Sequence, residues 1–269
     1  MDTAFDDRGL LSPRLVDSPH GSAGRGGPRL AQEMNTLRTL TRAMFGRLRR
    51  LGRLPTRRDR ADGSPTVQLL HPEHQTVIRR VRSSIHNNSI LLRGAPGSGK
   101  TAILRRLEQL LITGDQDSTG FFPVYIDLHG VHEILLFATV GEAVTRQAIA
   151  EPIMNPEDRN PDPSNAYGHR DLANDIRKVL RMLKERGTEK PRLVLLVDGI
   201  DELNSYSPRT AQRVRSLFMA SLDGNLVMVA TAVEIDRRWE EEGSPWYNFF
   251  EEIELATPRN DGEPTPYPG

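Results

Sequence analysis

The segment that most constrains this chain is an eight-residue run, Gly94-Ala-Pro-Gly-Ser-Gly-Lys-Thr101, which fits G-x-x-x-x-G-K-[ST] at every fixed position. An apolar, strand-like stretch precedes it at 89–93, and an amphipathic helical pattern follows to about Leu111. Glycines let successive backbone N–H groups point inward, and a helix N-terminus adds partial positive charge. The run therefore predicts a loop that cradles phosphate groups, with a glycine-rich turn that binds nothing as the alternative.

The residue types in this loop have distinct predicted tasks. Lys100 is long enough to reach the β- and γ-phosphates of a nucleotide, and the Thr101 hydroxyl is suited to coordinate magnesium. The remaining residues are expected to line the phosphate site: Gly94, Ala95, Pro96, Gly97, Ser98 and Gly99. The sequence therefore predicts a site for a nucleoside triphosphate with Mg²⁺.

A second motif follows about 100 residues later. The apolar run Leu193–Val197 has the composition of a strand buried on both faces, and it delivers Asp198 to the edge where parallel sheets bind ligands. A carboxylate there can hold magnesium through the water shell of the ion. Asp201 and Glu202 follow on the same rim, and either one can orient or deprotonate an attacking water. The alternative is an ordinary acidic turn after a buried strand.

Together, GAPGSGKT and LLVDGIDEL resemble the signal-transduction P-loop ATPases, especially the NACHT-type and related STAND branch of the AAA+ superfamily. In that branch a tiny residue follows the magnesium aspartate, and acidic residues come two and three positions after the aspartate. Gly199, Asp201 and Glu202 match this pattern, whereas most AAA+ motors carry Glu directly after the aspartate. The resemblance covers about residues 70–256 and implies ATP as the nucleotide. The absence of an N-K-x-D run, which would recognise guanine, also favours ATP.

The chain departs from this family pattern in two places. The family carries a polar or Arg sensor at the end of the strand after the magnesium-aspartate strand. Here Thr231 is the candidate, either as that catalytic sensor or as a plain strand residue, and Arg237 and Arg238 lie nearby to compensate. The family also carries a helical lid after the last strand. We expect none within the residues that follow Leu255 in this sequence, whether the protein is a minimal switch, is completed by a partner, or is a fragment. We therefore expect loose nucleotide binding and slow turnover unless a partner completes the site.

The order of the predicted elements defines the fold class. Strand patterns occur at 89–93, 122–128, 193–197, 226–231 and 251–255, and helical patterns at 72–86, from the loop to about 111, and at 138–150, 170–186 and 208–222. A proline-rich loop is expected at 152–168. Strands separated by crossover helices predict a parallel sheet with helices on both faces. The expected fold is a three-layer α/β P-loop NTPase domain spanning 67–256.

Different patterns flank this domain. Residues 1–28 are predicted to be disordered and 257–269 to form a flexible tail. Residues 29–66 are expected to hold a basic amphipathic helix, Leu30–Leu54, and a linker, because residues 29–60 contain ten Arg against two acids. This helix has four candidate targets: its own domain, a protein partner or second copy, nucleic acid, and an anionic membrane surface.

Composition excludes several other functions. The chain has no cysteine, so disulfides, thiolate catalysis and cysteine-bound zinc are absent. No stretch approaches the length of an apolar membrane span, and the acidic N-terminus lacks a signal pattern, which makes a cytoplasmic location the default. The spacing of His71 and His74 without further ligands argues against a metal site. The family resemblance instead implies that this region lies near the adenine, although the usual Gly-Arg pair of the family is missing. Trp239 and Trp246 are expected to be packing anchors rather than a platform for bases.

These observations predict a magnesium-dependent ATPase that acts as a nucleotide-controlled signalling or assembly switch. One alternative is an AAA+ motor or loader acting on DNA, although equal numbers of basic and acidic residues, 36 each, give no overall attraction to nucleic acid. The other alternative is a module that binds nucleotide without hydrolysing it.

Overall fold

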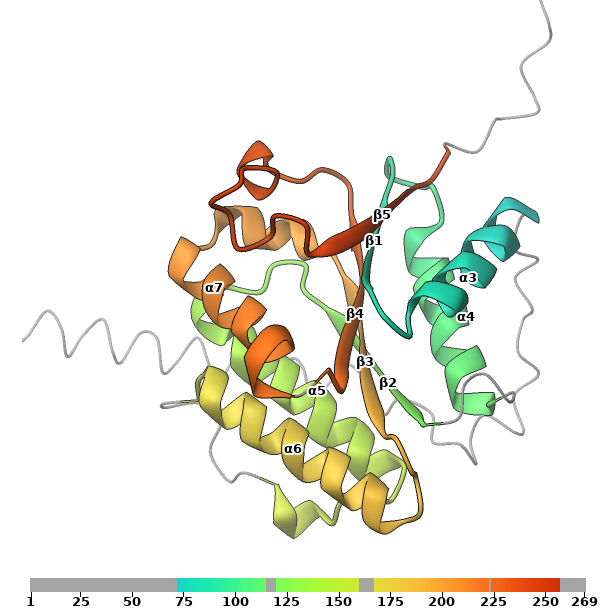
Figure 1. Ribbon diagram of the computed structural model, residues 1–269, viewed down its shortest axis with the longest axis vertical. Coiled ribbons are helices and arrows are strands. Elements are labelled where there is room, and N and C mark those ends of the chain that lie inside the picture. The colour runs from blue at the N-terminus through green and yellow to red at the C-terminus, as the bar shows by residue number, and fades with distance from the viewer. Residues whose placement is uncertain (1–71, 115–119, 160–166, 223, 257–269) are drawn as a thin grey trace, which may run out of the picture. The chain divides into compact units, whose positions relative to one another are not determined.

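The computed structural model describes residues 72–114, 120–159, 167–222 and 224–256, and its centre is one five-stranded sheet (Figure 1). The order across the sheet is β2-β3-β4-β1-β5, and every neighbouring pair is parallel. The strands are β1 (Ser89–Arg93), β2 (Phe121–Asp127), β3 (Arg192–Asp198), β4 (Leu226–Ala232) and β5 (Phe250–Glu254). Parallel pairing requires crossover connections, which the helices supply.

Helices cover both faces of this sheet (Figure 1). They are α3 (Pro72–Ser84), α4 (Lys100–Thr113), α5 (Leu136–Ala150), α6 (His169–Glu185) and α7 (Pro208–Ser216). In β1, Ile90 and Leu92 point into a core shared with α3 and α4, while Leu91 belongs to the larger core under α5, α6 and α7. Because successive side chains of a strand point to opposite faces of the sheet, β1 contributes residues to both hydrophobic cores. The predicted three-layer α/β P-loop NTPase fold is confirmed.

Sequence composition matches each strand's position in the sheet. Strands β3 and β4 lie inside it and are buried along nearly their whole length. The edge strand β2 contains Pro123, which an edge tolerates because proline has no N–H for the ladder. The other edge, β5, carries Glu251, Glu252 and Glu254, and such charges discourage pairing with another sheet edge.

The predicted elements agree with the observed ones to within a few residues, with one error of type. The predicted helix 208–222 is α-helical only to Ser216, and Leu217–Ser221 forms a π-helical turn. Side-chain periodicity does not separate these two, because a single wider turn keeps the apolar side facing the core. The loop expected at 152–168 includes a short 3-10 turn, Pro156–Asp158.

Predictions for the flanks fall outside the described residues. They are the disorder of 1–28, the basic helix and linker of 29–66, and the flexible tail of 257–269. The interactions expected of the basic helix therefore stay predictions. Within the described part of the chain, no helix combines the length and the apolar character needed to cross a membrane.

Replacement of a buried leucine tests the packing of α4 on the sheet. Leu107 in α4 is fully buried, so Leu107→Ala leaves a cavity while keeping a good helix former. We expect the free energy of unfolding to fall by about 2–5 kcal/mol in urea denaturation. Ile134→Ala is the control, since Ile134 is 62% exposed, and it should change stability by less than about 0.5 kcal/mol. Equal losses in the two variants would contradict the described packing.

Candidate nucleotide-binding site

The glycine-rich loop connects β1 to α4, and α4 begins at Lys100. Gly97 and Gly99 have φ angles of 82° and 87°, which glycine adopts without strain. A Cβ on Gly97 would meet nothing within 4 Å, so this side of the loop is open. A Cβ on Gly99 would lie 2.5 Å from Cε1 of His74. Glycine at 99 is therefore required both by the backbone angle and by the histidine ring.

Contacts with two other segments hold the loop in place. The Gly94 N–H donates to the Ala232 carbonyl at the end of β4 (3.3 Å). His74 of α3 lies with Nε2 3.1 Å from the Ser98 carbonyl oxygen, and the Ser98 side chain is fully buried. The structure therefore shows His74 in contact with the loop, and its expected position near the adenine stays a prediction. His71 lies outside the described residues.

Lys100 folds back over its own loop. Its Nζ donates to the carbonyl oxygens of Gly94 (2.6 Å) and Ala95 (2.9 Å). Burial lowers the pKa of Lys100, and the charges of Asp201 and Asp198 partly oppose this effect. The ammonium group therefore lies in the space between the loop and the acidic turn after β3.

Three hydroxyl groups converge on the Asp198 carboxylate at the end of β3. Oδ2 accepts hydrogen bonds from Thr101 Oγ1 (2.7 Å) and the Tyr125 hydroxyl (2.9 Å), and Oδ1 accepts one from Thr231 Oγ1 (2.5 Å). Burial alone would raise the pKa of Asp198, but the hydrogen bonds outweigh it and hold this pKa below its ordinary value. The carboxylate is therefore fixed in place and ionised.

Tyr125 was not singled out in the sequence. It lies on β2, its hydroxyl reaches Asp198, and the Arg105 guanidinium of α4 stacks over its ring, 3.2 Å from the centroid. Burial and the hydrogen bond to Asp198 raise the pKa of Tyr125, so the phenol stays protonated and donates. No motif identifies this residue, because its role depends on β2 lying beside β3.

In the acidic turn after Asp198, the carboxylates of Asp201 and Glu202 make different contacts. Glu202 Oε1 accepts a hydrogen bond from the Gly130 N–H (2.8 Å), which ties it to the loop after β2. Asp201 Oδ2 lies 3.4 Å from the Val233 nitrogen at the end of β4, and its charge acts on Lys100. Asp201 therefore lies toward the phosphate loop, while Glu202 is engaged elsewhere.

The structure explains why a glycine, Gly199, follows Asp198. Its φ is 74°, and a Cβ there would lie 2.7 Å from Cε1 of His129. The His129 ring is in turn held by Asp127, with Nδ1 and Oδ1 2.7 Å apart, and this contact raises the pKa of His129. Sequence reasoning missed both His129 and Asp127. Asp127 ends β2 and His129 follows that strand, and only the strand order places them beside the turn at Gly199.

The donor set suits magnesium. Among the described residues no group of three His, Asp or Glu side chains could hold a metal ion unaided. Mg²⁺ commonly takes only one or two protein ligands, with phosphate oxygens and water completing an octahedron. Thr101 Oγ1 and Asp198 Oδ2, 2.7 Å apart, are the two protein oxygens that would hold the ion.

A parallel sheet with a phosphate-type loop after β1 and an ionised aspartate ending β3 defines a P-loop NTPase domain. Residues 75–229 match the family model of the AAA ATPase domain. Because this match covers more than half of the chain, the chain belongs to that family. Its members typically bind ATP with Mg²⁺.

Solved structures give more distant similarities. The Walker-type ATPase of Pyrococcus abyssi is 18% identical, with 76% of this chain and 56% of that chain covered and a TM-score of 0.49. The Aeropyrum pernix ORC1 protein in complex with DNA is 16% identical, with 70% of this chain and 46% of that chain covered and a TM-score of 0.45. Cdc6p of Pyrobaculum aerophilum is 17% identical, with 71% of this chain and 48% of that chain covered and a TM-score of 0.41. This chain spans about half the length of these relatives. No curated protein matches the sequence.

Tyr125→Phe tests whether the phenol positions the aspartate. The change removes only the hydroxyl, so Asp198 loses one of its donors. Because groups that orient a metal ligand typically contribute about 10-fold or more to metal affinity, we expect the Mg²⁺ concentration that half-saturates ATP binding to rise about 10-fold. Calorimetric titration of ATP at a series of Mg²⁺ concentrations measures this.

Tyr167→Phe is the matched control, because the Tyr167 hydroxyl also donates to a carboxylate, Asp175 Oδ2 at 2.7 Å, on α6. It should leave the Mg²⁺ dependence unchanged. The positioning role of Tyr125 is wrong if the two variants show the same Mg²⁺ dependence.

Proposed function

We propose that this chain binds Mg·ATP between its glycine-rich loop and Asp198, hydrolyses it slowly, and acts as a nucleotide-controlled switch. The observation that carries the proposal is the hydrogen bond of 2.7 Å between Thr101 Oγ1 and Asp198 Oδ2. It joins two residues that are 97 positions apart in the sequence and that have the two oxygen types that magnesium needs. Gly94–Thr101 holds the phosphates, and Thr101 and Asp198 hold the ion.

For hydrolysis, we assign the attacking water to Asp201 and a positioning role to Glu202. The Asp201 carboxylate acts electrostatically on Lys100, whereas Glu202 accepts from the Gly130 N–H. Thr231 donates to Asp198 and accepts from the Gly199 N–H (3.1 Å), so we assign it the positioning of the metal aspartate and of the turn. ATP, oriented by these groups, loses its γ-phosphoryl group to water.

The switch role rests on contacts that lead away from the site. Asn204, in the 3-10 turn Ile200–Ser205, donates through Nδ2 to the Glu234 carbonyl (3.1 Å) and accepts through Oδ1 from the Asp236 N–H (3.1 Å). Arg238 also donates to the Asn204 carbonyl (3.0 Å). A shift of the acidic turn on nucleotide exchange is thereby passed to residues 233–238.

The proposed branch is the STAND type, with NACHT-like proteins as the nearest group. Gly199 supports this assignment. The positive φ at 199 would strain the Glu of AAA+ motors, and its Cβ would displace the His129 ring. A motor acting on DNA would instead couple turnover to DNA, which the hydrolysis experiment below measures directly.

Lys100→Ala tests nucleotide binding. Since hydrogen bonds to charged groups contribute about 1.5–3 kcal/mol, we expect ATP affinity to fall about 10- to 100-fold in calorimetry. Lys178→Ala is the matched control, because Lys178 bonds the Asp158 carbonyl on another part of the surface. Circular dichroism should show both variants folded. Unchanged ATP affinity in Lys100→Ala would sink the proposal.

Asp201→Asn and Glu202→Gln separate the two carboxylates. Asp201→Asn should spare ATP affinity and lower turnover about 100-fold, the low end of general-base effects. Glu202→Gln keeps an oxygen acceptor for the Gly130 N–H and should lose much less. Phosphate release is measured with and without duplex DNA. A large loss in Glu202→Gln alone reverses the assignment, strong DNA stimulation favours a motor, and no wild-type turnover favours a binding module.

A further inference from the structure

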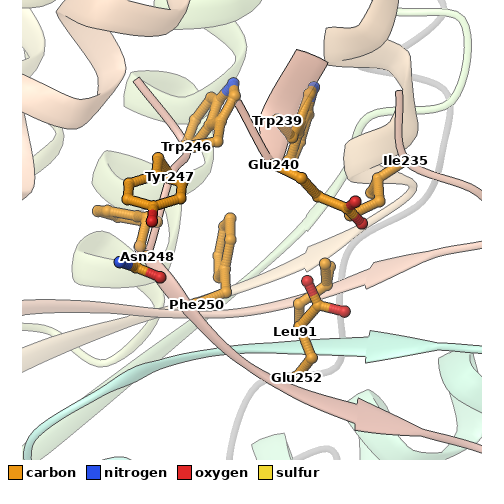
Figure 2. Close-up of a pocket in the computed structure, with 10 residues that line it drawn as sticks. Leu91, Ile235, Trp239, Glu240, Trp246, Tyr247, Asn248, Phe250 and Glu252 are labelled. Carbon is orange, nitrogen blue, oxygen red and sulfur yellow. The ribbon is translucent and has the colours of Figure 1, made fainter. Parts of the chain in front are cut away.

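A cavity of about 160 Å³ lies away from the phosphate loop, between the sheet and the segment that connects β4 to β5 (Figure 2). Its floor includes Leu91 of β1, on the sheet face opposite to α4. The connecting segment supplies two tryptophans, Trp239 and Trp246, and β5 supplies Phe250. None of these residues has a task in the nucleotide site described above.

The aromatic wall consists of three nearly parallel rings. The Trp239 and Trp246 centroids are 4.8 Å apart with an interplanar angle of 21°. Phe250 lies 6.3 Å from Trp239 and 5.9 Å from Trp246, at angles of 17° and 21°. Both tryptophans are largely buried, so packing holds the two rings in this arrangement. Parallel aromatic faces favour a flat or cationic group over a bulky branched one.

Two carboxylates line the same cavity (Figure 2). Glu252 on β5 forms an ion pair with Arg93, with Oε2 and Nη1 3.1 Å apart. Glu240 follows Trp239 directly, and its carboxylate has no hydrogen bond or ion pair to any residue that the structure describes. The cavity therefore combines aromatic surface with negative charge that the protein itself neutralises only in part.

The aromatic rings and the carboxylates together determine which kind of group the cavity can bind. An anion would be repelled by Glu240 and Glu252, and this excludes the phosphates of nucleic acid. A neutral apolar group would desolvate the carboxylates without pairing them. A guanidinium satisfies both features, because its plane stacks on aromatic rings while its N–H groups bond carboxylates. We propose that the cavity binds the arginine side chain of a partner protein.

The surroundings favour an arginine within a protein over the free amino acid. Glu241 and Glu242 follow Glu240, and all three are exposed, so these consecutive residues form an acidic stretch of surface that suits a basic partner. Free arginine brings an α-carboxylate, which this surface repels. An arginine inside a chain presents only its cationic end and neutral amides. The proposal does not depend on nucleotide binding.

The test uses intrinsic fluorescence of the full-length protein. The chain has two tryptophans, and both line the cavity, so tryptophan emission reports on this site alone. The probe is N-acetyl-L-arginine methylamide at constant ionic strength. We expect a saturable change with a dissociation constant on the order of 1–10 mM, as stacking plus one charged contact provides. N-acetyl-L-citrulline methylamide, the neutral isostere, should give no saturable change.

Variants place the response at the cavity. Glu240→Gln keeps the side-chain volume and should weaken arginine binding at least several-fold. Glu241→Gln, a neighbouring exposed acid that does not line the cavity, should leave binding close to wild type. Free L-arginine should bind more weakly than the blocked amide. Equal responses to arginine and citrulline amides, no response to either, tighter binding of free arginine, or equal effects of the two variants would overturn the proposal.

Discussion

The structure depends most on one buried carboxylate, that of Asp198. Burying an ionised carboxylate is costly unless hydrogen bonds replace its water. Here three hydroxyl groups do so, from Thr101 on α4, Tyr125 on β2 and Thr231 on β4. These donors can meet only if β2 and β4 flank β3 and the glycine-rich loop lies above them. The strand order, the position of the loop and the geometry of the proposed magnesium site thus express the same constraint.

A second constraint follows directly from the first. The chain leaves Asp198 through Gly199, whose positive φ would strain any other residue and where a Cβ would meet the His129 ring. The acids therefore come later, at Asp201 and Glu202, and the turn that carries them bonds two neighbouring segments. Glu202 is tied to the loop after β2, and Asp201 approaches the end of β4. One glycine thus decides which acidic side chain faces the phosphate loop.

The same turn connects the two proposed sites physically. Asn204 bonds Glu234, Asp236 and Arg238, and the chain then enters Trp239 and Glu240 at the rim of the aromatic cavity. These hydrogen bonds of Asn204 link the turn after β3 to the segment that lines the cavity. Titrating the arginine probe in the presence and absence of Mg·ATP measures whether this segment couples the two sites.

The sequence by itself determined the loop Gly94–Thr101, the aspartate at 198 and the parallel three-layer fold, because these depend on local motifs and on apolar periodicity. It also predicted α7 but missed its π-helical end, where the apolar pattern stays the same. Only the tertiary structure decided the roles of Tyr125, His129 and Asp127, since strand order brings them to Asp198 and Gly199. The aromatic cavity likewise depends on the fold. The segment between β4 and β5 packs on β1 and β5, and this packing brings the rings of Trp239, Trp246 and Phe250 together. The same packing places the Glu240 and Glu252 carboxylates at the cavity.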